Sequence, residues 1–543
     1  MSKTIETPVL IVGGGPVGLS LALDLSWRGV RCMLIERTDG AIDNPKTGHI
    51  ASRTMEFCRR WGITPRVRRC GFPDDYELNM VFCTSLAGHL LSRHRYPSMR
   101  DDQPVASPET KQRAPQMFFD PILAAAVKEQ ECATVRYRCE YQSFVQDGDR
   151  VRVQARDLVT GEDLNIEAQY LAACDGAGSR IRRTLGIAMQ GDTAISHSVA
   201  IYIRAPDLLR RHDKGPAERY IFVGHEGTWG NLTVVDGSYL WRLTVMGTQQ
   251  LVDQAVADPD YWVRRCLGDE TISYEVLSAV PWRRSRLVAE RYAEERVFLV
   301  GDSAHTMSPT GGFGMNTGVG DAVDLGWKLD ATLRGWAGPH LLDSYDIERR
   351  PVGWRNVNAA ADNFHSLMSA TDCSRILEKT AQAQEIRARI GAQLIHATRK
   401  EWECHGVVLG YRYEGSPIVV PDGTPPTGDD PADYEPTARP GHRAPHAWIE
   451  TGAASGSSTL DLFGQGFVLL RFGEPSIDVS TLLDAAARRK VPLAVADIAD
   501  ADIARLYARR LVLVRPDGHS AWRGDQAPSD PELVIDTVRG AFN

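Results

Sequence analysis

The stretch PVLIVGGGPVGLSLALDLSWRGVRCMLIE, residues 8–36, decides the fold. An apolar strand is predicted over 9–12, an amphipathic helix over 19–27, and a second strand over 31–35 that ends at Glu36. Gly13, Gly15 and Gly18 form a GxGxxG pattern, and Glu36 stands 18 positions after the last glycine. This order and spacing are typical of a βαβ unit that binds a dinucleotide.

Each part of this unit has a physical role. Gly13 allows the tight turn from strand to helix, Gly15 lets a pyrophosphate approach bare backbone, and Gly18 lets the helix pack closely on the strand. The N-terminus of the helix offers free N–H groups that would face the phosphates. Glu36 would accept hydrogen bonds from a ribose. The alternative is a structural βα turn without a ligand.

Composition restricts the class of protein. The 543 residues are 43% hydrophobic and 24% charged, which excludes disordered, collagenous and membrane proteins and allows about three or four domains. A net charge of -8 gives no reason to expect a nucleic-acid partner. The ten cysteines show no CxxC spacing, and no His or carboxylate pair has a convincing metal spacing, so we expect reduced thiols and no metal. Without a signal peptide or an apolar run of about 20 residues, the protein is predicted to be cytoplasmic, with no membrane contact.

Further glycine-rich turns follow apolar strands downstream. The strand over 170–174 ends at Asp175, and the strand over 296–300 ends at Gly301 and Asp302. Pro309 and the turn 311–316 then precede a helix over about 317–333. Because ligands bind at the carboxyl ends of parallel strands, an aspartate there can hold a sugar or polyol hydroxyl.

The chain is predicted to be an α/β protein with an interrupted nucleotide fold. We expect residues 1–187 and 286–416 to form that fold and residues 188–285, with alternating apolar and polar positions, to form an inserted antiparallel sheet that binds substrate. Residues 417–445 have linker composition, and 446–543 are expected to form a small mixed α/β domain.

With these blocks in view, the sequence resembles the class A flavoprotein aromatic hydroxylases, in the branch that includes phenol hydroxylase, 3-(3-hydroxyphenyl)propionate hydroxylase and polyketide hydroxylases. The resemblance covers essentially the whole chain. It is carried by the glycines at 13–18, by Arg53-Thr54-Met55-Glu56, by Asp175-Gly176 with Ser179-Arg180, by Gly301-Asp302, and by Ser344-Tyr345 with Glu348-Arg349-Arg350-Pro351.

The resemblance implies a Rossmann-like FAD-binding domain, an inserted antiparallel-sheet domain and a C-terminal thioredoxin-like domain. It implies FAD, NAD(P)H without a nucleotide fold of its own, and O2, with oxygen transferred through a flavin hydroperoxide to a small phenolic substrate, with or without loss of a ring substituent. It does not distinguish NADH from NADPH. The implied FAD ligands are Gly13, Gly15, Pro16, Gly18, Glu36, Arg37, Arg53, Gln116, Asp175, Asp302, Gly312, Gly314, Met315 and Asn316.

Within that set, the resemblance places Arg53 and Gln116 near the pyrophosphate and ribityl region, Asp302 on the ribityl chain, and Asp175 near both FAD and nicotinamide. Pro309 and the turn 311–316 would lie along the isoalloxazine. The family often has glutamine where this chain has Phe313, so a polar side-chain contact is not expected at that position.

The sequence indicates the substrate-binding and catalytic residues less clearly than the FAD ligands. His49 is a candidate acceptor for the phenol proton, and the alternative is a loop histidine bonded to backbone. Tyr202 and His225 on the predicted sheet are candidate substrate contacts, although most aromatic residues in such a sheet form core. The C-terminal domain contains no cysteine, so we expect a structural or homodimer-supporting role and no thiol chemistry.

Two other functions would share the nucleotide motifs. A flavin-dependent halogenase or reductase would not need the thioredoxin-like domain, and the halogenase signature Trp-X-Trp-X-Ile-Pro does not occur in this sequence. A non-catalytic FAD-binding module would not need the glycine geometry around the flavin ring.

Overall fold

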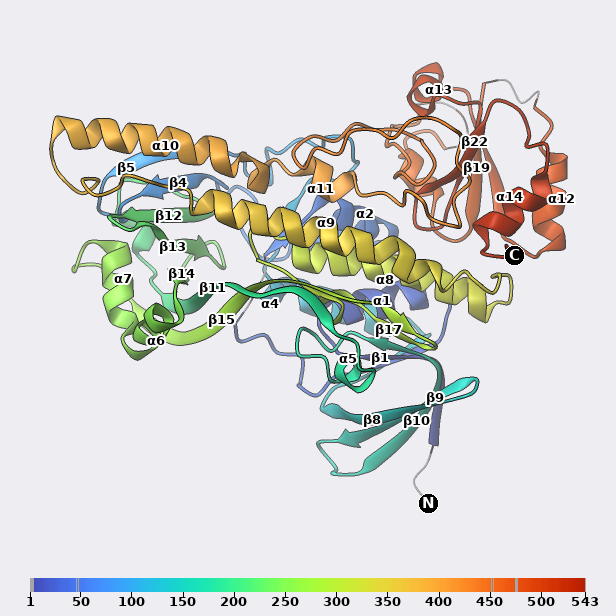
Figure 1. Cartoon of the computed structure of the whole chain (residues 1–543), viewed down its shortest axis with the longest axis horizontal. Helices are drawn as coiled ribbons and strands as arrows, with labels where there is room; N and C mark the ends of the chain where they lie inside the picture. Colours follow the sequence, from blue (N-terminus) through green and yellow to red (C-terminus); the bar gives the residue numbers. More distant parts are fainter. Residues whose placement is uncertain are drawn as a thin grey trace.

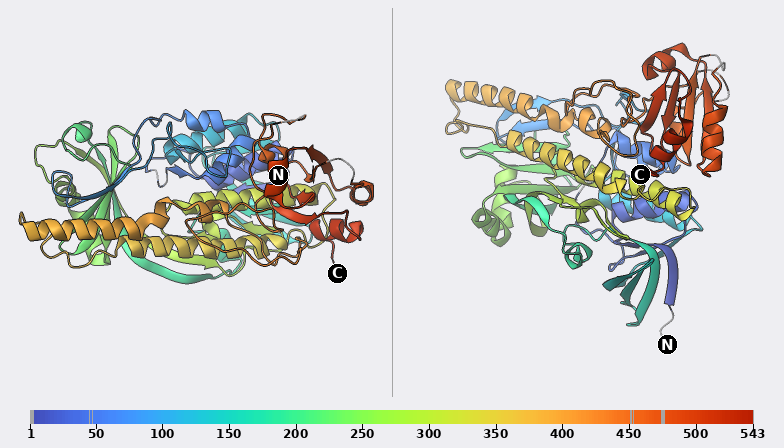
Figure 2. Two further views of the ribbon diagram at one scale, coloured as in Figure 1. Left: turned by 90° about the horizontal axis from the view of Figure 1, so that it is seen from above. Right: turned by 45° about the vertical axis from the view of Figure 1, so that its right-hand side comes forward.

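The structure is a computed structural model that describes residues 4–44, 46, 48–450, 452, 454–473 and 477–542. A parallel sheet with packed helices lies at the centre, a second sheet lies at one end, and a C-terminal α/β domain lies at the other (Figures 1 and 2). The predicted fold class is therefore confirmed. Within the described residues, no helix has both the length and the apolar character needed to span a bilayer.

The first sheet carries the nucleotide unit. Its main strands run in the order β16 (Ala293–Glu294), β17 (Val297–Leu299), β10 (Asp163–Ala173), β1 (Thr4–Val12), β2 (Cys32–Ile35) and β7 (Ala133–Arg136). β1 pairs in parallel with β10 on one side and with β2 on the other, so the strand order reverses at β1. A ligand crevice is expected outside the carboxyl ends of strands at such a reversal. β8 (Cys139–Asp147) and β9 (Arg150–Asp157) extend β10 as an antiparallel ribbon.

Helices α1 (Pro16–Trp27) and α8 (Phe313–Leu333) pack together beside this sheet, and α9 (Ser344–Leu367) lies against α8 (Figure 1). The contact of α8 is unusually close at Gly318. A Cβ added there would lie 2.6 Å from a Val17 methyl group and 3.0 Å from the Gly301 Cα atom. Glycine at this position therefore lets α8 begin directly beside the end of β17.

The second sheet runs in the order β18 (His305–Thr306), β15 (Glu275–Ala289), β11 (Met189–Arg204), β14 (Leu240–Gly247), β13 (Gly227–Val234), β12 (Arg219–Gly224), β4 (Met80–Cys83) and β5 (Leu90–His94). β4 and β5 come from the part of the chain assigned to the nucleotide fold, and β12 pairs with β4 in parallel. The second sheet therefore also contains residues outside the predicted insert of 188–285. β4 and β5 form one edge of this sheet, and the sequence pattern of the insert does not reveal them.

The two faces of this sheet differ. One face packs its apolar side chains, among them Ile201 and Leu243, against α6 (Gln249–Ala257) and α7 (Pro259–Leu267). The other face contacts α9 and α10 (Ala381–Trp402) at its edge through Phe82 and Ile221. Alternation along each strand places its remaining polar side chains on this second face, toward the nucleotide fold.

The C-terminal domain has a four-stranded sheet in the order β20 (Leu493–Ile498), β19 (Phe467–Phe472), β21 (Leu511–Val514) and β22 (Ser520–Gly524). Its helices are α12 (Ser480–Arg488), α13 (Ala501–Tyr507) and α14 (Pro531–Val538). Residues 417–445, which are all described, contain no helix or strand, and the single bridge between Arg443 and His519 joins them to this domain.

A buried network of charges joins the C-terminal domain to α8 and α9. Lys328 Nζ lies 2.8 Å from Asp324 Oδ2 and 2.7 Å from Glu348 Oε2. Arg515 Nη2 lies 2.8 Å from Glu348 Oε2 and 2.8 Å from Asp517 Oδ2. All five side chains are buried. Each charge depends on its partners, because an unpaired charge in this environment would be strongly destabilising.

We expect Arg515→Met to destabilise the protein by about 3 to 5 kcal/mol, because it leaves Glu348 and Asp324 with one cation between them. The measurement is the free energy of unfolding in urea. Arg488→Met is the matched control, since Arg488 pairs with Glu532 at the surface and its loss is expected to change stability by about 0.5 kcal/mol or less. Equal effects of the two substitutions would contradict a stabilising role for the network.

Candidate active site

Four strand ends meet at one edge of the first sheet. β1 leads to Gly13, β2 to Glu36, β10 to Asp175, and β17 to Gly301 and Asp302. The backbone is compressed here. A Cβ at Gly13, whose φ is +113°, would lie 2.2 Å from the Cys174 carbonyl oxygen, and a Cβ at Gly18 would lie 2.0 Å from the Gly13 carbonyl oxygen. Only glycine permits this approach.

Gly15 differs from its neighbours because its environment is open. It precedes α1 with an ordinary φ of -74°, and no side chain caps the helix. A Cβ at Gly15 would meet no protein atom within 4 Å. The first N–H groups of α1 therefore border open space, which is the geometry of an anion site at a helix N-terminus.

The Glu36 carboxylate is fixed beside the same turn. Its Oε2 atom accepts a hydrogen bond from the Gly14 N–H at 2.7 Å, and Oε1 accepts one from the Thr38 N–H at 2.8 Å. Arg37 follows it and is exposed. Glu36 thus lies at the end of β2, where the predicted ribose contact requires a carboxylate.

Two aspartates complete the edge. Asp175 Oδ2 accepts the Arg180 N–H at 2.8 Å, while its buried Oδ1 atom has no hydrogen-bond partner in the described part of the chain. Asp302 is exposed to solvent on one side and surrounded by protein on the others. Desolvation raises the pKa of Asp302, and His305 and Lys46 oppose this shift. Both groups have acceptor capacity for a ligand.

Asn316 fixes the second glycine-rich turn. Gly311 and Gly312 have φ values of +97° and +68°, and α8 begins directly after them. The Asn316 amide nitrogen donates to the carbonyl oxygens of His49 and Gly312 at 3.0 and 2.7 Å. Its oxygen accepts the Ala51 N–H and the Thr54 hydroxyl at 2.9 and 2.7 Å. Because these four bonds use the whole side-chain amide, Asn316 positions the turn, and the predicted contact of its backbone with the cofactor stays a prediction.

Arg53 bonds to groups of α2 and of the C-terminal part of the chain. It belongs to α2 (Ser52–Arg60), and its Nη1 atom lies 2.7 Å from Glu56 Oε2. Nη2 donates to the Asp517 carbonyl oxygen at 2.9 Å and Nε to the Tyr411 hydroxyl at 3.3 Å. These bonds direct the guanidinium to the C-terminal domain, and its contact with the cofactor stays a prediction.

His225 follows β12 directly, and its predicted contact with substrate stays a prediction. His225 is exposed in the turn between β12 and β13, and its Nδ1 atom lies 2.7 Å from the Ser374 carbonyl oxygen. Arg219, at the other end of β12, borders the strand-end region, and six residues of strand separate the two by roughly 20 Å. His225 therefore supports the segment between α9 and α10.

The other predicted residues lie around the two turns. Pro16 begins α1, and Gln116 begins α4 (Gln116–Lys128) and accepts the Lys46 N–H at 3.2 Å. Gly314 and Met315 lie in the first turn of α8, and Pro309 is exposed just before Gly311. Tyr202 is buried on β11 beside Arg242 and Ser278 of the neighbouring strands. Their roles toward cofactor or substrate remain predictions.

Sequence analysis missed a row of polar residues across the second sheet. Tyr202, Arg242, Thr233 and Arg219 are cross-strand neighbours, so their side chains share the face toward the nucleotide fold. Arg242 Nη1 donates to the Lys46 carbonyl oxygen at 2.9 Å. Arg219 Nη1 lies 2.6 Å from Glu401 Oε1. The row thereby connects the sheet to the loop before His49 and to the end of α10.

Arg284 extends this row to the turn before α8. Its Nη1 atom donates to the hydroxyls of Ser308 and Thr310 at 3.1 and 3.4 Å, and its guanidinium lies 4.6 Å from the ring centres of both Trp282 and Phe364. Desolvation, with Arg219 and Arg242 nearby, lowers the pKa of Arg284 to about 9. Arg284 thus holds the residues on both sides of Pro309.

We call Lys111, Arg113, Arg219, Arg242 and Arg284 the cationic cluster. Glu218 and Glu401 pair with Arg113 and Arg219 at 2.8 and 2.6 Å, and Asp102 lies near Lys111. Mutual repulsion is expected to make such a cluster attractive to an anion.

The cluster surrounds His49. His49 lies on β3 (His49–Ile50), paired with Arg113 on β6 (Gln112–Arg113). Desolvation lowers the pKa of His49 to about 4; Glu218 opposes the shift, and Lys111, Arg113 and Arg219 add to it. The imidazole is therefore neutral at physiological pH and a weak base.

The geometry of the strand ends fits FAD. Open backbone at Gly15 and the fixed Glu36 carboxylate match the AMP half, and exposed Asp302 lies at the end of β17 for a polyol chain. The unpaired acceptor of Asp175 and the glycine turn at 311–312 lie along the same edge. The sequence therefore assembles one continuous dinucleotide site from three separate segments.

Gly15→Ala is expected to fold normally and to weaken FAD binding at least tenfold, because the added methyl would fill only the open space that the pyrophosphate requires. The measurements are the flavin-to-protein absorbance ratio and the far-ultraviolet circular dichroism. Gly428→Ala is the control, since a Cβ there also meets no atom within 4 Å. Full flavin content in Gly15→Ala would contradict the predicted path of the pyrophosphate.

Comparison with known proteins agrees with this geometry. Residues 6–360 match the FAD binding domain family, and residues 437–541 match the aromatic-ring hydroxylase C-terminal family. The chain is 32% identical to a 4-methyl-5-nitrocatechol 5-monooxygenase of Burkholderia sp., over 99% of this chain and 98% of that protein.

Solved structures of the same size are also similar. RebC soaked with chromopyrrolic acid, with bound 7-carboxy-K252c, superposes with a TM-score of 0.91 at 41% identity, over 99% of this chain and 100% of that one. The flavin-dependent monooxygenase PieE in complex with FAD and substrate gives a TM-score of 0.88 at 33% identity, over 99% of both chains. These likenesses confirm the predicted cofactor and reaction class. The chain therefore belongs to the class A FAD-dependent aromatic hydroxylases and is an NAD(P)H-dependent flavoprotein monooxygenase.

Proposed function

We propose that this monooxygenase hydroxylates a phenolic ring that also carries an acidic group, and that the cationic cluster binds this group. The observation that supports this proposal is the excess of the five cations over their three neighbouring carboxylates, Glu218, Glu401 and Asp102, between the second sheet and the turn at 308–312. Two relatives support an acidic or polar substrate: RebC was solved with a carboxylated ligand, and the Burkholderia enzyme acts on a nitrocatechol.

The protein side chains would orient this substrate. Arg242 and Tyr202 lie side by side on the sheet face that looks toward the nucleotide fold, where a ring could lie flat against them. Arg284 fixes Ser308 and Thr310, so the turn along the flavin ring keeps one position relative to that face. Bound FAD supplies the transfer of electrons from NAD(P)H and the activation of O2.

The same cations would favour the reactive form of the phenol. A nearby positive charge stabilises a phenolate and lowers its pKa. Because His49 has a pKa of about 4, it is a poor general base for a phenol. In this proposal the cationic cluster, and not His49, favours loss of the phenol proton. A neutral imidazole can still accept a hydrogen bond from the ring hydroxyl.

The pH dependence tests this division of roles. His49→Gln is expected to leave the pH profile of kcat unchanged between pH 6 and 9, because a group with a pKa of about 4 is already neutral across that range. Steady-state NAD(P)H oxidation coupled to product formation gives the profile. An inflection near pH 7 that the substitution abolishes would instead identify His49 as the base.

Arg242→Met tests the acidic group. We expect KM for a carboxylated phenol to rise roughly 10- to 100-fold, which is the value of one charge-assisted hydrogen bond, and KM for the uncharged parent phenol to stay within about twofold. Arg204→Met is the matched control, because Arg204 lies on the neighbouring strand β11, two residues after Tyr202, but pairs with Glu275 at the surface. Equal losses for charged and uncharged phenols would overturn the acidic-substrate proposal and leave the monooxygenase assignment intact.

Three further features belong to the proposal. Loss of a ring substituent during hydroxylation is compatible with the name of the nitrocatechol relative. The ten cysteines, all free, support a reducing compartment and hence the cytoplasm. A homodimer stays a prediction, for which sedimentation of the purified protein is the direct measurement.

A further inference from the structure

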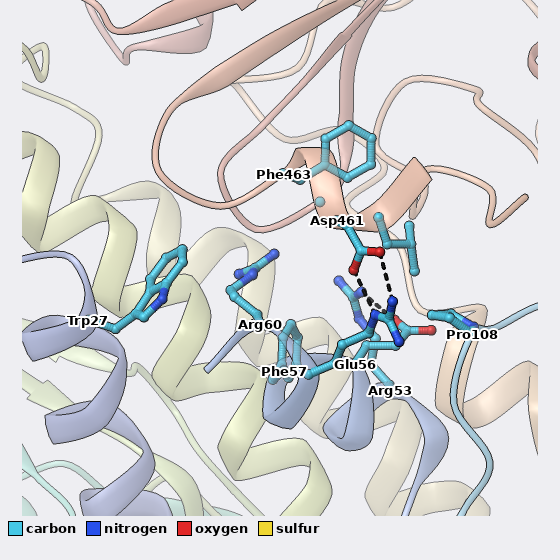
Figure 3. Close-up of a pocket in the computed structure, with 11 residues that line it drawn as sticks. Trp27, Arg53, Glu56, Phe57, Arg60, Pro108, Asp461 and Phe463 are labelled. Carbon is cyan, nitrogen blue, oxygen red and sulfur yellow. Dashed lines mark hydrogen bonds and ion pairs between the residues drawn. The ribbon is translucent and has the colours of Figure 1, made fainter. Parts of the chain in front are cut away.

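A cavity lies between α2 and the C-terminal domain, apart from the flavin site. Its volume is about 220 Å³, and its lining includes Trp27 at the end of α1, Phe57 and Arg60 on α2, and Phe463 and Gly518 of the C-terminal domain (Figure 3). The first turn of α2 contacts Asn316, and Arg60 is the last residue of that helix. Arg53, Glu56, Phe57 and Arg60, which also line the cavity, share one face of α2 by their spacing, whereas Thr54 contacts Asn316 from another face of the helix.

Arg60 is the cation of this cavity that lacks an anionic partner. The Asp461 carboxylate is taken by Arg59, with distances of 2.7 and 2.9 Å, and the Glu56 carboxylate is taken by Arg53 and Arg443. Arg60 has neither a hydrogen bond nor an ion pair with any described residue, and its Nη1 atom is buried. In Figure 3 its side chain points from α2 into the space between Trp27 and Asp461.

The charges around Arg60 do not offset the loss of hydration that burial of its guanidinium causes. Desolvation lowers the pKa of Arg60 to about 10; Asp24 opposes this, while Arg28 and Arg53 add to it. Asp24 is itself bound to Arg28 at 2.7 Å. An oxyanion on the Arg60 guanidinium would restore the interactions that burial removes.

The backbone of the C-terminal domain is shaped to approach Arg60 without covering it. Gly464 has a φ of +143°, and a Cβ there would lie 2.7 Å from the Trp27 ring and 3.2 Å from Arg60 Nε. Gly518 has a φ of +89°, and a Cβ there would lie 3.9 Å from Arg60 Nη2. Any larger residue at these two positions would fill the space beside the guanidinium.

Aromatic side chains line the rest of the cavity. Trp27, Phe57 and Phe463 belong to three separate segments, and the Arg60 guanidinium lies 5.5 Å from the Phe57 ring centre. A planar guanidinium binds a carboxylate through two parallel hydrogen bonds, and aromatic rings favour contact with another ring. The volume is below the roughly 300 Å³ at which sites for drug-sized ligands begin, which restricts the ligand to one ring.

We propose that this cavity binds a small aromatic carboxylate, with the carboxylate on Arg60 and the ring among Trp27, Phe57 and Phe463. Such a ligand would touch α1, α2 and the C-terminal domain at once. It would therefore stabilise the contact between the domains, because a ligand that binds only the assembled state shifts the unfolding equilibrium. This site is independent of the substrate proposed above.

The first test locates the ligand. Crystals of the full-length FAD-loaded enzyme are grown with 4-bromobenzoate, and the bromine is located by anomalous scattering. We expect a peak in the cavity beside Phe463, its loss in Arg60→Met and its retention in Arg66→Met, a control in which Arg66 pairs with Glu129 at the surface just beyond α2. A bromine found only near the cationic cluster would overturn the proposal, because that result reports the substrate site.

The second test measures the effect in solution. Benzoate is expected to raise the melting temperature of the wild-type and Arg66→Met holoenzymes, and neutral benzamide at the same concentration is not. The rise should fall by at least half in Arg60→Met and be partly kept in Arg60→Lys, which retains the charge. An equal rise with inorganic phosphate would contradict an aromatic ligand, and an equal rise in Arg60→Met would remove Arg60 from the site.

Discussion

Backbone contacts too close for any Cβ atom hold the centre of this enzyme together. At Gly18 the first helix approaches the Gly13 carbonyl oxygen, and at Gly318 the long helix α8 approaches Gly301. These contacts bring the ends of β1, β10 and β17 to one edge and place the start of α8 above it. The position of every group along the flavin follows from that packing, because α8 then presents Asn316 to the segment that carries His49.

The second sheet contributes charge to this frame. α6 and α7 cover its apolar face. Arg219 and Arg242 lie on the opposite face, which is directed toward the nucleotide fold. Arg284 then connects that face to the turn beside the flavin ring through Ser308 and Thr310. Under the proposed function, a rigid sheet and not a loop would set the distance between the bound substrate and the reacting ring, which is the arrangement that precise orientation requires.

The local part of this architecture could be predicted from sequence. The βαβ unit, the strand ends at Asp175 and Asp302 and the glycine turn before α8 are all contiguous patterns with a known spacing rule. The cationic cluster could not, because Arg219 and Arg242 become neighbours only through the antiparallel register of β12, β13 and β14, and Arg284 approaches them from β15. Arg53 shows a different limit of sequence patterns. Its motif is local, but the direction of its side chain is set by Glu56 and by Asp517, which lies 464 residues further along the chain.

The buried charges between α8, α9 and Arg515 have a consequence for how this family can diversify. Lys328, Asp324 and Glu348 come from the catalytic body, whereas Arg515 and Asp517 come from the C-terminal domain, and none of them is tolerable without the others. A chimera that joins this catalytic body to the C-terminal domain of a relative inherits an unbalanced interior charge unless Arg515 and Asp517 are carried over into the new domain.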